Sequence, residues 1–401
     1  MPTVLLIGTL DTKSQEYAFV RDLIRARGLD VLVMDIGVLG AADSDVDITP
    51  AEVARAGGAA LDELRSTRDR GAAIDVMLAG ARSFTRQLFA DGRFHGVLGL
   101  GGGGGTAMIT AAMRELPVGM PKVMVSTMAS GNTAPYVDVK DITMMYSVVD
   151  IAGLNPLSRR ILANAAGAIV GMISQEVPAA GLERPLVAAT MFGVTTPCVT
   201  AARQLLELAG YDVLVFHATG TGGRAMEGLI DDGYFSGVLD VTTTEWCDEV
   251  VGGVLSAGPN RLSAAARAGI PQVVSLGALD MVNFGAPNTV PSRFDDRTFY
   301  HHNPTVTLMR TTAEECREIG RRIADQLNRA TGPVALLVPL KGVSMIDAAG
   351  QPFYDPHADR ALFDALREHI RPPVRIRELD LHINDPEFSS ALADELLAMI
   401  A

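Results

Sequence analysis

The stretch Leu88–Leu100, LFADGRFHGVLGL, decides the fold, because Leu229–Val241, LIDDGYFSGVLDV, repeats it further along the chain. Seven of the thirteen positions are identical, namely Leu, Asp, Gly, Phe, Gly, Val and Leu. Short apolar strands that alternate with helical segments are typical of a parallel sheet with helices on both faces. The match therefore predicts two similar α/β domains. The alternative is that unrelated α/β units share Gly-Val-Leu strands by common pattern alone.

Two further matches follow in the same order. Ala26–Asp35, ARGLDVLVMD, pairs with Leu208–His217, and Met120–Thr127, MPKVMVST, pairs with Ile270–Gly277. Because the order is kept in both halves, chance is a poor explanation.

We expect two Rossmann-like, doubly wound parallel-sheet domains with a cleft between them. The first covers residues 1–184 and the second covers 185–401, which includes a C-terminal extension, so the join lies near Glu183–Pro185. Strands are expected at Thr3–Ile7, Val31–Met34, Gly96–Leu100, Lys122–Val125, Leu186–Met191, Val213–Phe216, Val334–Val338 and Val374–Leu379. Helices are expected at Ser14–Arg27, Ala51–Arg68 after a Thr49 cap, Ala72–Phe89, Thr106–Leu116, Leu157–Gln175, Thr196–Ala209, Thr311–Arg329 after a Thr312 cap, Ala361–His369 and Pro386–Ile400.

Composition excludes several classes of protein. The formal net charge is −13, with 34 Lys and Arg against 47 Asp and Glu, which argues against a nucleic-acid partner. No stretch of about 18 apolar residues occurs, so we expect no membrane partner. The three cysteines show no CxxC spacing, so neither a disulfide framework nor a zinc cluster is expected, and a cytoplasmic location fits.

The glycine run Gly101–Gly105 joins an expected strand to an expected helix. Backbone N–H groups in such a loop can approach an anion closely, and the helix adds its positive end. Candidate ligand contacts are Gly102, Gly103, Gly104 and Thr106. A close-packed or flexible turn is the alternative, although five glycines are costly in folding entropy.

A second loop, Gly220–Arg224, also lies between a strand and a helix. Its candidate contacts are Gly220, Thr221, Gly222, Gly223 and Arg224. Their amides could cap a phosphate, and the guanidinium offers a fork of donors. Glu227 could position Arg224 or help to hold a metal. An ordinary glycine-rich turn with a solvated arginine is the alternative.

The first strand ends in GTLDTK, which places Thr9, Asp11, Thr12 and Lys13 at the start of a helix. Asp11 or Thr12 could simply cap that helix. Lys13 is harder to explain, because a cation opposes the helix dipole at this end. Its presence makes sense if an anion binds there.

The remaining polar segments favour structural roles. In TTTEWCDE, residues 242–249, we expect a helix cap with acids at the positive helix end, and Cys247 has no nearby histidine to activate it. DPHAD, residues 355–359, is expected to cap a helix, and no metal site is predicted. Lys341 follows a strand and is a candidate for the ligand cleft.

These loops resemble one family throughout the chain. The segments GTLDTKSQEY, GLGGGGGTAM, HATGTGGRAMEGLI, TTTEWCDEVVGGVLSAGPNRL and PLKGVSMIDAAGQPFYDP are similar to those of an uncharacterised bacterial and fungal family. That family includes the N-terminal inhibitory domain of a tomato mosaic virus resistance protein. The resemblance implies ATP binding, with or without Mg²⁺, two Rossmann-like subdomains and self-association. It implies nucleotide contacts at Lys13, at Gly220–Arg224 and at the Gly101–Thr106 run.

Three functions are open at this point. The first is a cytoplasmic ATP-binding protein of unassigned reaction, the second is a non-catalytic nucleotide-dependent regulator of a partner protein, and the third is a small-molecule transferase or hydrolase. The plant relative carries a barrel domain after the matching region, which implies a separate barrel-fold protein as a partner here. We also expect a homodimer, because Ile142–Ile151 is apolar, although this segment could instead pack between the two domains.

Overall fold

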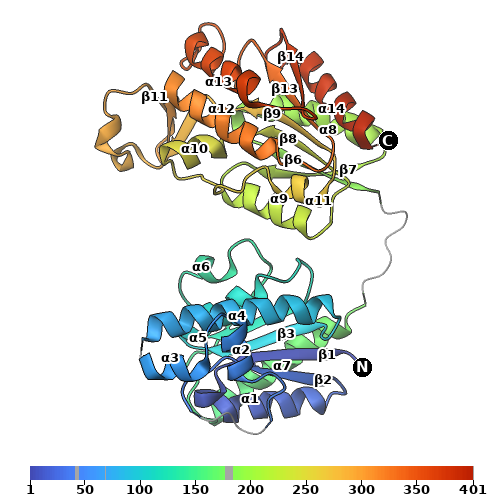
Figure 1. Cartoon of the computed structure of the whole chain (residues 1–401), viewed down its shortest axis with the longest axis vertical. Coiled ribbons are helices and arrows are strands. Elements are labelled where there is room, and N and C mark those ends of the chain that lie inside the picture. The colour runs from blue at the N-terminus through green and yellow to red at the C-terminus, as the bar shows by residue number, and fades with distance from the viewer. Residues whose placement is uncertain (41–44, 68, 177–183, 401) are drawn as a thin grey trace. The chain divides into compact units, whose positions relative to one another are not determined.

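The computed structural model describes residues 1–40, 45–67, 69–176 and 184–400 (Figure 1). The chain divides into two compact units, Met1–Ala179 and Ala180–Ala401, which we call the N-terminal and C-terminal units. The predicted join at Glu183 lies outside the described residues.

The N-terminal unit contains a five-stranded sheet in which every neighbouring pair of strands is parallel. Across the sheet the strand order is β2-β1-β3-β4-β5. The strands are β1 (Thr3–Gly8), β2 (Asp30–Asp35), β3 (Gly96–Gly101), β4 (Lys122–Ser126) and β5 (Thr143–Tyr146). This is a doubly wound order, in which the chain leaves β1 toward one edge and returns to build the other.

Helices cover both faces of this sheet (Figure 1). One face carries α1 (Leu10–Arg25) and α7 (Pro156–Ser174), and the other carries α2 (Pro50–Ala56), α3 (Leu61–Thr67), α4 (Arg70–Ala90) and α5 (Gly103–Met113). The short helix α6 (Ala134–Val137) follows β4. Strand β1 shows why its sequence is a continuous apolar run: Val4 and Leu6 pack on the α1 side, whereas Leu5 and Ile7 pack on the other.

The C-terminal unit repeats this plan with six strands in the order β7-β6-β8-β9-β13-β14, all parallel. The strands are β6 (Leu186–Met191), β7 (Asp212–His217), β8 (Gly237–Thr242), β9 (Gln272–Gly277), β13 (Val334–Pro339) and β14 (Arg375–Leu379). Helices α8 (Thr196–Leu208) and α14 (Pro386–Ile400) pack on one face. The opposite face carries α9 (Thr221–Asp231), α10 (Glu245–Val251), α11 (Ala264–Ala268), α12 (Ala313–Leu327) and α13 (Pro356–His369).

The predicted internal repeat is confirmed. In each unit a helix, α4 or α9, ends shortly before a glycine with positive φ, and the third strand of the sheet follows. The φ angles are 62° at Gly92 and 82° at Gly233, a region that glycine enters without steric cost. The fold class predicted from the repeat, two Rossmann-like α/β sheets, is therefore confirmed.

Some expected elements differ in detail. The helix expected at Ala51–Arg68 is two helices, α2 and α3, because Gly58 between them takes a φ of 94°. A Cβ atom on Gly57 would lie 2.0 Å from the Val76 carbonyl oxygen, so the break also lets α4 approach closely. The helix caps expected at Thr49 and Thr312 are confirmed as capping boxes with Glu52 and Glu315.

The sequence analysis did not anticipate a three-stranded antiparallel sheet in the C-terminal unit. Its strands, in the order β10-β12-β11, are β10 (Met281–Phe284), β12 (Val306–Arg310) and β11 (Phe299–Asn303). The apolar segment Ile142–Ile151 contributes the edge strand β5, and Tyr146 at its end and Val148 just after it are exposed. Self-association through this segment stays a prediction. None of the described helices combines the length and the apolar character needed to cross a bilayer.

Candidate functional site

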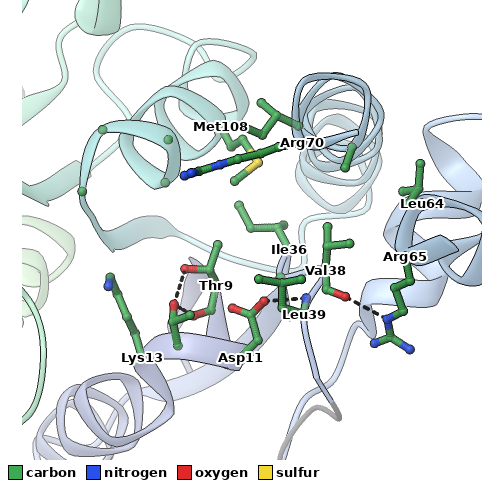
Figure 2. A pocket seen from close by; sticks show the side chains of 18 of the residues that line it. Thr9, Asp11, Lys13, Ile36, Val38, Leu39, Leu64, Arg65, Arg70 and Met108 are labelled. Atoms are coloured by element: carbon green, nitrogen blue, oxygen red, sulfur yellow. Dashed lines mark hydrogen bonds between the residues drawn. The ribbon is translucent and has the colours of Figure 1, made fainter. Parts of the chain in front are cut away.

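A pocket of about 690 Å³ opens at the carboxyl end of the N-terminal sheet (Figure 2). It lies where the chain switches direction, between the loops that follow the neighbouring strands β1 and β3. Helix α1 after β1 and helix α5 after β3 pack on opposite faces, so the two loops part and leave space. Loops after β1, β2 and β3 therefore line the pocket together with α3 and α4.

The glycine run forms one wall of this pocket and begins α5. Gly102 is the N-cap residue and no side chain caps the helix, so the N–H groups of the first turn have no intrahelical acceptor. Packing requires glycine only at Gly101, where a Cβ atom would lie 2.9 Å from the Thr106 nitrogen. A Cβ atom on Gly103 or Gly104 would meet nothing closer than 3.9 Å, and on Gly105 nothing within 4 Å. The run therefore leaves a bare helix N-terminus facing open space.

Among the residues that the structure describes, three cations line the pocket. Arg70, at the start of α4, places its Nη2 3.9 Å from where a Cβ on Gly104 would lie, and no ion pair of its guanidinium occurs within the described residues. Lys13 donates to the Ile151 carbonyl oxygen at 2.9 Å, which leaves two ammonium hydrogens for other acceptors. Arg65 donates to the carbonyl oxygens of Val38 and Gly40 and so holds the loop after β2. Arg70 and Lys13 are the cations that can meet an anion.

Figure 2 shows how these side chains converge: Arg70 and Met108 lie on one side of the pocket, and Thr9, Asp11 and Lys13 lie on the other. The hydroxyls of Thr9 and Thr12 are 3.3 Å apart. The predicted contact Thr106 does not line the pocket. Its hydroxyl is buried and lies 2.6 Å from the Ser126 hydroxyl.

Carboxylates build the loops around the pocket. Asp11 Oδ2 accepts from the Leu39 amide at 2.7 Å, while its buried Oδ1 has no hydrogen-bond partner within the described residues. Asp35, at the end of β2, accepts from the amides of Leu10 and Gly37. Burial raises the pKa of Asp35. Asp35, at the end of β2, therefore holds the loop after β1 against the loop after β2. Asp11, in the loop after β1, joins the same two loops through the Leu39 amide.

The rest of the lining is apolar. Leu39 is 71% exposed although it is a large hydrophobic residue, and it faces the pocket together with Leu64 on α3. Ile74 on α4 and Met108 on α5 complete this wall. A pocket with a bare helix N-terminus and cations at one end and aliphatic side chains at the other suits a ligand with an anionic part and an apolar, planar or bulky part.

The loop Gly220–Arg224 is arranged differently. The amides of Gly220 and Gly223, at the start of α9, donate to Glu245 Oε1 at 2.7 and 3.1 Å. A Cβ on Gly223 would lie 2.3 Å from a Glu245 oxygen. A carboxylate of the chain thus occupies the position where a phosphate was expected, and Thr221 and the exposed Arg224 flank it.

Glu245 belongs to a buried ion network that the sequence analysis missed. Arg261 is buried and donates to Glu245 at 2.6 Å, to both oxygens of Asp240 at 2.5 and 2.6 Å, and to Glu227 at 3.3 Å. Glu245 and Asp248 lie in the first turn of α10, as expected for acids at a helix N-terminus, but Glu245 also pairs with Arg261, which the sequence did not indicate. Glu227 accepts from Arg261 and from the amides of Leu262 and Ala264.

Threonines at or just after the ends of β6 and β8 fill the equivalent switch point in the C-terminal unit. Thr190 donates to Asp240, and the hydroxyls of Thr195 and Thr242 lie 2.8 Å apart, all fully buried. Thr244 does not cap α10 with its side chain. No histidine contact of Cys247 occurs in the described contacts. Its thiol is buried and donates to the Leu279 carbonyl, and burial raises its pKa well above the usual value.

The DPHAD segment caps α13, as predicted: Asp355 accepts from the amides of His357 and Ala358 at 3.1 Å. Asp359 and Asp347 instead lie against Arg310, at 2.5 and 3.7 Å, although they are 49 and 37 residues away from it in the sequence. Within the described residues no cluster of histidine, cysteine and acidic side chains suits a metal ion.

Comparison with known proteins identifies relatives over the whole chain. Residues 2–178 match the N-terminal domain, and residues 184–400 the C-terminal domain, of an uncharacterised protein family, UPF0261. A UPF0261 protein of Clostridium tetani is 55% identical over 99% of this chain and 98% of its own length. The tomato mosaic virus resistance protein Tm-1 of Solanum lycopersicum is 41% identical over 99% of this chain, which spans 55% of that protein. Among solved structures, MurG of Acinetobacter baumannii aligns over both chains with 12% identity and a TM-score of 0.24.

Proposed function

The chain belongs to the uncharacterised protein family UPF0261, and we propose that it is a cytoplasmic protein that binds ATP in the pocket of its N-terminal unit. The observation that carries this proposal is the bare N-terminus of α5. Packing explains glycine at position 101 but not at Gly103, Gly104 or Gly105, where side chains would have room. A close approach of ligand to backbone does explain them, and phosphates bind at such helix ends.

The charges and the apolar wall suggest how the nucleotide lies. The phosphates contact the first-turn amides of α5, with Arg70 beside them and Lys13 opposite. The base packs between Leu39, Leu64 and Met108. The volume of about 690 Å³ falls in the range of small-molecule pockets.

The proposal is one of binding and names no reaction. Within the described part of the chain, the carboxylates that line the pocket are Asp11 and Asp69, and both accept backbone hydrogen bonds: Asp11 from Leu39, and Asp69 from Gly71 and Ala72. A general base needs a carboxylate within reach of the attacking group. This arrangement favours a nucleotide-dependent regulator of a partner protein as the second candidate function.

Calorimetric titration of the full chain with ATP, with and without Mg²⁺, tests the proposal. Arg70→Ala is expected to weaken binding by about 1.5–3 kcal/mol, the range for a hydrogen bond to a charged group. The matched variant is Arg224→Ala, which removes an exposed arginine at the other glycine-rich loop. Loss of affinity in Arg224→Ala but not in Arg70→Ala would move the nucleotide to the C-terminal unit and overturn the proposal.

A further inference from the structure

A second cavity, of about 590 Å³, lies within the C-terminal unit. Its walls come from the loop after β13, from α13 and from the loop after β14. These are the carboxyl ends of parallel strands, the edge at which sheets of this kind bind ligands. The ATP proposal makes no use of this cavity.

Backbone hydrogen bonds hold the cavity open in a defined shape. The amides of Leu340 and Lys341 donate to carbonyl oxygens of Leu379 and Leu381 at 2.9 and 3.0 Å, and Ile383 donates back to Gly342. Gly342 has a φ of 129°, and a Cβ atom there would lie 1.8 Å from the Asp347 carbonyl oxygen. These hydrogen bonds fix the segment that carries Lys341 against the end of β14, so less conformational entropy is lost when a ligand binds.

The lining is basic in a chain that is acidic. It contains three cations, Lys341, Arg360 and Arg367, against one carboxylate, Asp359, whereas the whole chain has a formal net charge of −13. Arg367 is engaged by ion pairs with Asp364 and Glu378.

The other two cations are available to a ligand. Lys341 pairs with Asp380 at 3.0 Å, but both side chains are more than half exposed, so water competes with this pair. Arg360 has no ion-pair partner in the part of the chain that the structure describes. An anion in the cavity could therefore form ion pairs with both Lys341 and Arg360.

Apolar side chains form the opposite part of the lining. Leu340 and Tyr354 are 37% and 48% exposed, which is unusual for large hydrophobic residues, and Phe363 lies behind them on α13. A purely inorganic ion would leave this surface in water. The cavity therefore suits an anion that carries an apolar body.

The remaining polar groups help to define the ligand. His382 uses both ring nitrogens, with Nε2 2.9 Å from the Ser344 carbonyl oxygen and Nδ1 accepting from the Asn384 amide, so it has no free nitrogen for the cavity. Asp359 is held by Arg310 at 2.5 Å. Burial, then the neighbouring Asp347, raises the pKa of Asp359, and Arg310 balances its charge, so this carboxyl repels an anion in the cavity less.

We propose that this cavity is a second ligand site, which binds a small organic anion. Its anionic oxygens, of a carboxylate or a phosphate ester, contact Arg360 and Lys341, and its apolar body packs against Leu340, Tyr354 and Phe363. The site is separate from the proposed ATP pocket, because all of its lining belongs to the C-terminal unit.

Three probes of similar size test this site by calorimetry on the full chain: phenyl phosphate, benzoate and uncharged phenol. We expect phenyl phosphate or benzoate to bind at least about tenfold more tightly than phenol, since hydrogen bonds to charged groups contribute roughly 1.5–3 kcal/mol each. Whichever anion binds more tightly identifies the ligand's anionic group. Equal binding of phenol, or no binding of either anion at millimolar concentration, would overturn the proposal.

Variants locate the bound probe. Arg360→Glu is expected to weaken anion binding about tenfold or more, because it replaces an attractive charge with a repulsive one. Arg371→Glu, which changes an exposed arginine outside the lining, is the control and should leave binding unchanged, whereas Arg70→Glu reports any probe that binds in the ATP pocket instead. If Arg70→Glu abolishes binding and Arg360→Glu does not, the probe occupies the ATP pocket and the second site does not exist. Since Arg360 is exposed, its variant should melt at the wild-type temperature.

Discussion

The third strand of each sheet is followed by a different sequence: Gly101–Gly105 in the N-terminal unit and Thr-Thr-Thr-Glu-Trp, residues 242–246, in the C-terminal unit. In the N-terminal unit the first residues of α5 are glycines, and a pocket of about 690 Å³ opens in front of them. In the C-terminal unit, Glu245 and Trp246 are buried, and Glu245 binds the amides of Gly220 and Gly223.

This difference teaches that strand order alone does not make a ligand site. Both units have a switch point between their first and third strands, where the fold leaves space. In the C-terminal unit the chain fills that space with threonine hydroxyls and the Arg261 ion network. In the N-terminal unit the glycines leave that space open to a ligand. The predictions below test this contrast.

The largest effect is expected from removing the cation of the filled switch point. Arg261→Ala leaves Asp240, Glu245 and Glu227 with no counter-charge in a buried site, which should lower the unfolding free energy by about 3–5 kcal/mol. Urea unfolding followed by fluorescence of the single tryptophan, Trp246, measures this directly.

The control for that experiment is an arginine of the open pocket. Arg70 is exposed and has no ion pair among the described residues, so Arg70→Ala should change the unfolding free energy by less than about 0.5 kcal/mol. Equal losses in the two variants would mean that the ion network is not what stabilises the filled switch point.

The next largest effect is expected from copying the filled arrangement into the open pocket. When the sequence match of Leu88–Leu100 with Leu229–Val241 is continued without a gap, Gly104 aligns with Glu245, and Gly104→Glu would bring a carboxylate to the N-terminus of α5. We expect ATP affinity to fall by about 2–3 kcal/mol, because the carboxylate competes for the amides and Arg70. Calorimetry measures the loss.

Gly104→Ala is the matched control, since its Cβ atom would have no neighbour closer than 3.9 Å. Its ATP affinity should stay within about threefold of wild type, a change of roughly 0.7 kcal/mol. If alanine weakens binding as much as glutamate does, the backbone conformation of glycine, and not the space in front of it, is what the ligand requires.

A pH effect is expected from the buried acid of α10. Burial raises the pKa of Asp248 to about 7, well above its usual value near 4. Between these two values the folded state binds a proton that the unfolded state has released, so Asp248 contributes stability that falls as the pH rises toward 7. Asp248→Asn should flatten the Trp246-monitored stability profile between pH 4 and 7 by up to about 1.4 kcal/mol per pH unit. An unchanged slope would contradict this origin.

The smallest effect is expected at a helix cap. Thr312 and Glu315 form a capping box at the start of α12, so Thr312→Ala should lower the unfolding free energy by about 1 kcal/mol. Thr312→Ser keeps the hydroxyl and should retain most of that stability. A serine variant as unstable as alanine would assign the effect to the lost methyl group.

Much of the fold could be predicted from local pattern. The strand at Thr3–Ile7 was predictable because burial on both faces demands a continuous apolar run, and the cap at Thr312 because its partner Glu315 is three residues away. The antiparallel strands β10, β11 and β12 were missed, since their pairing joins segments that short apolar patterns do not single out.

The candidate site was predicted in part. Thr9, Asp11, Lys13 and three of the glycines were identified from their place after strands, and the structure brings them to one pocket. Arg70 was missed because it begins a helix about 30 residues before the glycine run and belongs to no motif. Arg261 was missed because it lies in a turn and shows no motif, and so the Gly220–Arg224 loop looked as open as the first glycine run.

By itself, then, the sequence determined the two α/β units, their internal repeat and most of the helix and strand positions, because periodicity, caps and glycine turns act between residues close together in the chain. Only the tertiary structure decided which of the two glycine-rich helix N-termini, at α5 or at α9, is open to a ligand. That outcome depends on whether a side chain from a distant segment reaches the helix amides first: Glu245 does so at α9, 22 to 25 residues after Gly223 and Gly220, whereas no described side chain caps α5. Neither glycine-rich loop carries that information within its own sequence.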